Sequence, residues 1–143
     1  MEENSINVLD ELNKGCCMGM DAINFVLKKV DGNEFKKILT EQLENYRNIS
    51  EKINELYPKY SENDPHETST MEKVMTWYGI QIRTITDSSS SKLAELILKG
   101  TDMGIIEGKK LLNHKYTDKK VEDLIKEYIK MQEKAVEKLK EFL

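Results

Sequence analysis

Apolar residues near the start of the chain recur at alternating steps of three and four. This spacing places them on one face of an α-helix, and the stripe consists of Leu9, Leu12, Cys16, Gly19, Ile23, Val26 and Val30. The Asp31-Gly32-Asn33 segment then predicts a tight turn. A second stripe follows, which Pro58 is expected to end; it consists of Phe35, Leu39, Gln42, Tyr46, Ile49, Ile53 and Leu56.

A polar stretch separates this hairpin from the rest of the chain. Within it, Ser69 followed by Glu72 is a capping-box pattern, which predicts the start of a shorter helix. The apolar face of that helix consists of Met71, Val74, Tyr78, Ile82 and Ile85. The serine-rich run 86–91 predicts its end and an N-cap for the next helix.

The second half of the sequence resembles the first. Residues 12–20, LNKGCCMGM, and residues 96–105, LILKGTDMGI, share Lys-Gly-x-x-Met-Gly at an offset of 85. A third stripe consists of Ala94, Ile97, Thr101, Gly104, Gly108 and Leu111. A turn near 115–118 precedes the last stripe, which matches the second at an offset of 86 and consists of Val121, Ile125, Tyr128, Gln132, Ala135, Leu139 and Phe142.

These stripes predict an all-α, up-down four-helix bundle made of two repeated helical hairpins. We expect one domain over 1–143, with hairpin one at 5–57, a crossover with a short extra helix at 58–91 and hairpin two at 92–143. Short turns make the helices of each hairpin antiparallel. The long crossover carries the chain along the bundle, so the second and third bundle helices are expected to run parallel and to lie diagonally.

Composition excludes several classes of protein. The net charge is −4 and no block of like charges predicts a nucleic-acid or membrane-surface contact. No apolar run is long enough to span a membrane, and the polar N-terminus lacks the pattern of a signal peptide. Cys16 and Cys17 are adjacent and do not form a disulfide framework. We therefore expect a cytoplasmic protein.

Polar residues interrupt the middle of the apolar stripes. Pairing the helices about their turns places Cys16 level with Tyr46 and Thr101 level with Gln132. Buried amides and hydroxyls need partners. The hypothesis is therefore two hydrogen bonds across the bundle, Gln42 with Tyr128 and Tyr46 with Gln132. The alternative is that one or both tyrosines extend their hydroxyls to the surface.

Glycines at a spacing of four are the second unusual feature of the core. Each costs about 1 kcal/mol relative to alanine inside a helix, so their presence needs a compensation. Close packing of the first and third bundle helices is one, and a small cavity or ligand slot beside the glycines is the alternative. The glycines are Gly15, Gly19, Gly100, Gly104 and Gly108.

The repeated Lys-Gly-x-x-Met-Gly segments and the hairpin pattern resemble the ferritin-like superfamily, in particular a bacterial branch of small bundle proteins. The resemblance implies a metal site built from a Glu on each of the first and third helices and a Glu-x-x-His on each of the others. Here Cys16 and Thr101 stand at the inward Glu positions, and neither Tyr46 nor Gln132 belongs to a Glu-x-x-His. We expect no metal, no cofactor and a vestigial site.

Three functions are compatible with this sequence. We expect first a non-enzymatic ferritin-like bundle that serves as an interaction or stress-associated module, without a catalytic residue. The alternatives are a small-ligand binder beside the core glycines, with an unknown ligand, and a metal-binding oxidoreductase. A homodimer is expected as the partner state, because Tyr57 and Trp77 are candidates for an outer apolar face.

Overall fold

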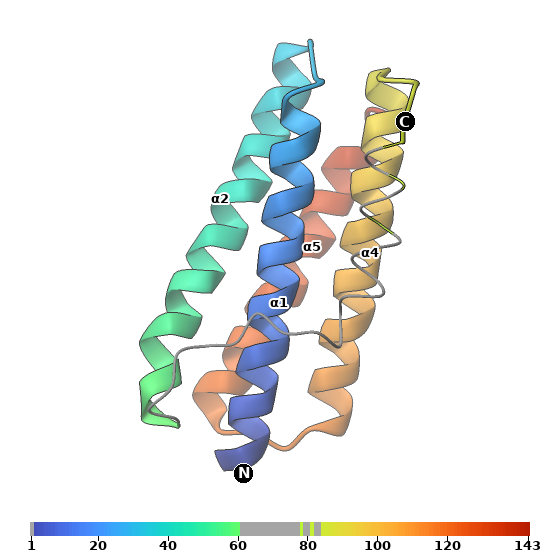
Figure 1. Cartoon of the computed structure of the whole chain (residues 1–143). Helices are drawn as coiled ribbons and strands as arrows, with labels where there is room; N and C mark the ends of the chain where they lie inside the picture. The colour runs from blue at the N-terminus through green and yellow to red at the C-terminus, as the bar shows by residue number, and fades with distance from the viewer. Residues whose placement is uncertain (1, 61–77, 79–80, 82–83) are drawn as a thin grey trace.

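Four long helices make up the computed structural model, which describes residues 2–60, 78, 81 and 84–143 (Figure 1). They are α1 (Glu2–Leu27), α2 (Asn33–Leu56), α4 (Ser90–His114) and α5 (Lys119–Lys140). A short 3₁₀-helix, η1 (Tyr57–Lys59), follows α2. The predicted all-α hairpins are confirmed. The apolar face of the predicted crossover helix falls mostly outside the described residues, at Met71, Val74 and Ile82.

The helix ends lie where the local sequence favours them. Pro58 stands in the first turn of η1, directly after α2, because proline cannot continue the hydrogen-bond ladder of an α-helix. At the start of α4, the Ser89 hydroxyl accepts a hydrogen bond from the Lys92 amide at 3.3 Å. This is the N-cap predicted from the serine-rich run.

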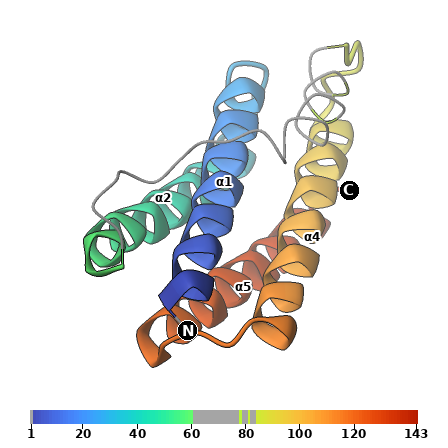
Figure 2. The same cartoon turned by 60° about the horizontal axis from the view of Figure 1, so that its bottom comes forward.

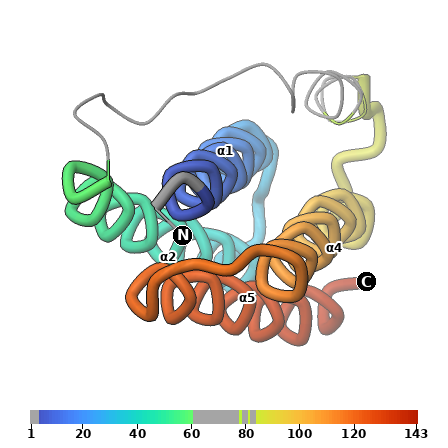
Figure 3. The backbone as a smooth tube through the Cα atoms, turned by 90° about the horizontal axis from the view of Figure 1, so that it is seen from below, coloured from blue at the N-terminus to red at the C-terminus, as the bar shows by residue number. Residues whose placement is uncertain are grey.

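The chain runs up, down, down and up through the bundle. In Figures 1 and 2, α1 and α5 run in one direction and α2 and α4 in the other. The view along the bundle in Figure 3 places α1 beside α4 and α2 beside α5. Helices α2 and α4 are therefore parallel and diagonal, as the length of the crossover predicts.

The predicted apolar stripes meet in one continuous core. At one end of the bundle, the rings of Phe35 and Phe142 stack with their centroids 5.0 Å apart. This contact joins α2 to the residues after α5, so it ties the two hairpins together. The side chains buried almost completely include Leu9, Leu12, Ile23, Leu39, Ile49, Ile53, Leu93, Ile125 and Leu139.

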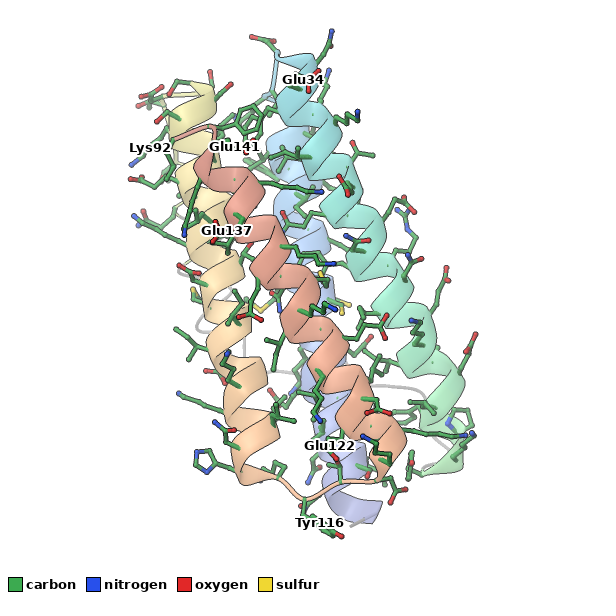
Figure 4. The ribbon with its side chains drawn as sticks, turned by 180° about the vertical axis from the view of Figure 1, so that it is seen from behind. Glu34, Lys92, Tyr116, Glu122, Glu137 and Glu141 are labelled. Atoms are coloured by element: carbon green, nitrogen blue, oxygen red, sulfur yellow. The ribbon has the colours of Figure 1, made fainter. Side chains whose placement is uncertain are left out.

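Charged side chains cover the outside of the bundle. Figure 4 shows Glu122 and Glu137 projecting from the outer side of α5. Two ion pairs join α2 to α5, Lys52 with Glu127 at 2.5 Å and Lys138 with Glu41 at 2.8 Å. Exposed pairs of this kind contribute little stability, so the core carries the fold. None of the helices in the described ranges is long and apolar enough to cross a membrane.

Tyr57 lies differently from its predicted place, whereas Tyr78 is buried, as its position on the predicted apolar face of the crossover implies. Tyr57 is buried, with 2% of its surface exposed, so it does not belong to an outer apolar face. It is the first residue of η1, directly after α2, and its side chain belongs to the core. Tyr78 is also buried, and its hydroxyl donates to the Leu96 carbonyl at 2.6 Å. Trp77, the other residue of the predicted dimer face, lies outside the described residues.

Candidate functional site

Hydrogen bonds between side chains cross the middle of the core. The Tyr46 hydroxyl donates to Oε1 of Gln132 at 3.0 Å, and Nε2 of Gln132 donates to the Tyr128 carbonyl at 3.2 Å. Both Tyr46 and Gln132 are at least 97% buried. The predicted Tyr46–Gln132 pair is therefore present, and it links α2 to α5.

The second predicted pair, Gln42 with Tyr128, is wrong. Nε2 of Gln42 instead donates to the Thr101 hydroxyl at 3.0 Å, and that hydroxyl donates to the Ile97 carbonyl at 2.8 Å. The reason is the direction of the Tyr128 ring, whose hydroxyl lies against Gly15 of α1. Sequence pairing correctly identified the central layer but not the diagonal partner on α4.

The core glycines make room for side chains from other helices. A Cβ on Gly19 would lie 2.5 Å from the Tyr46 ring, and one on Gly15 would lie 2.1 Å from the Tyr128 hydroxyl. On α4, a Cβ on Gly104 would lie 2.0 Å from Oε1 of Gln132. These distances are well inside van der Waals contact, so only glycine fits these positions without movement of the neighbour.

Direct packing of α1 on α4 at these glycines is therefore not what the structure has. The atoms nearest to the missing Cβ come from side chains, Tyr78 at Gly100 and Ile129 at Gly108 included, and not from the facing backbone. Long side chains of α2 and α5 extend between α1 and α4 and contact the glycines there. Corresponding positions in the two halves of the sequence make corresponding contacts: Tyr46 lies against Gly19, and Gln132 lies against Gly104.

A cavity of about 260 Å³ lies between α1 and α4, beside these glycines. The sequence analysis left such a cavity open as the alternative to close packing of the two helices. Its wall is mostly apolar, with Leu12, Ile23 and Ile97 among the lining residues. Polar groups line it as well. They are Tyr78 of the crossover, the carboxylates of Glu11 and Glu107, and the central-layer residues Gln42, Tyr46, Thr101, Tyr128 and Gln132.

The central layer is uncharged at neutral pH. Burial raises the pKa of the Cys16 thiol and of the Tyr46 phenol well above their usual values. It also raises the pKa of Tyr78 and of Tyr128, because a low-dielectric interior disfavours the ionised form. Amides and the threonine hydroxyl do not ionise. The layer therefore offers neutral donors and acceptors and no anionic ligand.

The two cysteines have separate surroundings. Cys16 is fully buried and Cys17 is half-buried, and neither forms a disulfide. Consecutive residues of a helix point about 100° apart, so the two thiols do not face one site. A neutral buried thiol acts as a small apolar side chain, which is the role of Cys16 in the core.

Comparison with solved structures finds one with the same arrangement of helices. Its TM-score is 0.76 over 99% of this chain and 85% of that chain, at 15% sequence identity. The fold is that of a ferritin-like four-helix bundle. The matching structure is a bacterioferritin-related protein of Bacteroides fragilis, described as a dodecameric thioferritin. At this identity the likeness shows the fold alone. No family model and no curated protein matches the chain.

A ferritin-like bundle implies a metal pair in the central layer, which requires suitable ligands there. A metal pair of this kind is held by carboxylates and imidazoles. The corresponding layer here contains Cys16, Tyr46, Thr101 and Gln132, all neutral and three of them engaged in hydrogen bonds. In the described ranges, no three His, Cys, Asp or Glu side chains are grouped to hold a metal. The residues do not fit the metal pair.

Proposed function

We propose that this ferritin-like bundle is a non-catalytic protein that binds a small organic molecule in the cavity between α1 and α4. The observation that carries the proposal is the cavity of about 260 Å³ at the level of the central layer. Engineered apolar cavities of roughly 150 Å³ already bind benzene. A cavity of this size therefore has room for a single ring with a substituent.

The chemistry of the wall favours binding over catalysis. A general acid or base needs a pKa near the working pH, whereas burial holds the lining tyrosines Tyr46, Tyr78 and Tyr128 in their protonated forms. The amides of Gln42 and Gln132 orient a ligand without reacting with it. This supports the interpretation of the central layer as a vestigial metal site that has become the inner wall of a binding cavity.

Titration with benzene tests the proposal. We expect the backbone amide resonances of Gly19 and Gly104, which line the cavity, to shift with saturation at millimolar benzene. The amide of Gly32, in the turn between α1 and α2, serves as the control and should not move. Metal analysis of untagged protein grown with iron and manganese should find well under one metal per chain. Unmoved glycine resonances, or stoichiometric metal, would contradict the proposal.

The second candidate is an interaction module that acts through self-association. The B. fragilis protein is described as dodecameric, and Ile106 and Tyr116 of this chain are more than half exposed. We expect a homodimer, which light scattering would register as twice the chain mass of 16.6 kDa. A mass of one chain at micromolar concentration would remove this candidate and leave the binding proposal untouched.

A further inference from the structure

We infer that the cavity selects an uncharged ligand, a flat ring of benzene size that carries one neutral polar group such as a hydroxyl or an amide. This inference rests on the proposed function and goes beyond it by naming the class of ligand. Three features of the cavity carry it: its apolar wall, the neutral polar groups at its inner end and the absence of a cation among the described residues that line it.

The apolar wall sets the body of the ligand. Leu12 and Ile23 come from α1 and Ile97 from α4, and the lining tyrosines add rings from α2, α5 and the crossover. The Tyr46 and Tyr128 rings are tilted by 57° with centroids 6.5 Å apart. Aromatic rings prefer such offset and tilted neighbours. A ring-shaped ligand therefore gains both apolar burial and aromatic contacts.

The glutamines that line the cavity determine which polar group the ligand can carry. The described hydrogen bonds use one hydrogen of each amide nitrogen, Gln42 to Thr101 and Gln132 to the Tyr128 carbonyl. A primary amide nitrogen carries two hydrogens, and its oxygen has two lone pairs. Gln132, whose oxygen accepts from Tyr46, therefore keeps one amide hydrogen and one lone pair. Gln42 also interacts with the Tyr46 hydroxyl and keeps less capacity. A hydroxyl or amide on the ligand can both donate to and accept from these groups.

Charge on the ligand would be penalised. No Lys, Arg or His lies among the described residues that line the cavity, so an anion would lose its hydration without a compensating partner. A cation would meet the carboxylates of Glu11 and Glu107, which also line the cavity. Each of these is already paired with a lysine of its own helix, Lys14 at 3.0 Å and Lys110 at 3.6 Å.

Three ligands of one ring size and different charge test the inference. We expect benzyl alcohol to shift the Gly19 and Gly104 resonances with a Kd on the order of 0.1–1 mM. Benzoate and benzylamine, which are charged at pH 7, should bind at least about tenfold more weakly. Tighter binding of either charged compound would overturn this inference and leave the proposed function standing. If none of the three binds, this inference is wrong, and the benzene titration decides the proposed function separately.

A matched pair of variants locates the site. Ala22 lines the cavity, whereas Ala135 lies in the groove between α2 and α5 on the opposite side, and both are buried. Ala22→Leu should weaken benzyl alcohol binding at least about tenfold by filling the cavity, and Ala135→Leu should leave it unchanged. Equal loss in both variants, with helical circular dichroism retained, would place the ligand elsewhere and overturn the inference.

Discussion

Replacing Tyr46 with phenylalanine is expected to lower the free energy of unfolding by about 2 kcal/mol. The ring and its packing on Gly19 stay, but Oε1 of Gln132 loses the hydroxyl that donates to it at 3.0 Å. Gln132 is 99% buried, so water does not readily replace that donor. Urea denaturation followed by circular dichroism measures the change.

A double-mutant cycle identifies the cause. Gln132→Met alone leaves the Tyr46 hydroxyl without its acceptor and should also cost about 1–3 kcal/mol. The combined variant removes both polar groups, so its loss should be clearly smaller than the sum of the two single losses. Tyr116→Phe is the control, because that side chain is 72% exposed, and it should change little. Additive losses would show that the hydrogen bond does not couple the two residues.

Gly19→Ala is expected to destabilise the protein by about 1–2 kcal/mol, even though alanine favours a helix by about 1 kcal/mol over glycine. The new Cβ would lie 2.5 Å from two atoms of the Tyr46 ring. That ring is 97% buried and is held by Gln132, so it cannot move away freely. Overpacking therefore outweighs the gain in helix propensity.

Asn24→Ala on the same helix separates the two effects. Asn24 is exposed, so this change keeps the gain in propensity without a clash and should raise stability by up to about 0.5 kcal/mol. In a Tyr46→Leu background, which lacks the ring, Gly19→Ala should no longer cost stability. If Gly19→Ala stabilises the unmodified protein in urea denaturation, the steric explanation is wrong.

The glycines explain why the cavity persists in a bundle of this size. A core normally reaches crystal-like packing density, with few voids larger than water. Here the tyrosine and glutamine side chains reach across to the glycines of α1 and α4, and the cavity lies beside them. The Tyr46 hydroxyl and the Gln42 and Gln132 amides are held by hydrogen bonds, so these side chains do not rotate freely into the remaining space.

Much of the fold follows from the sequence alone. Alternating steps of three and four predicted the four helices, and Pro58, the serine-rich run and the 31–33 turn predicted where they end or begin. These are local signals, since periodicity and capping act within a few residues. Pairing the helices of each hairpin about their turns also placed five polar residues at similar heights in the bundle, as one central layer. They are Gln42, Tyr46, Thr101, Tyr128 and Gln132.

The tertiary structure decided which groups in that layer touch. Gln42 binds Thr101 across the bundle rather than Tyr128, and Gly15 receives a tyrosine rather than a facing helix. Each outcome depends on the rotation of a side chain about its helix and on the distance between diagonal helices, which no residue spacing encodes. The sequence by itself therefore predicted the ferritin-like bundle and the neutral residues that stand in its central layer. Only the packing of four helices in space determined that a cavity lies beside the glycines.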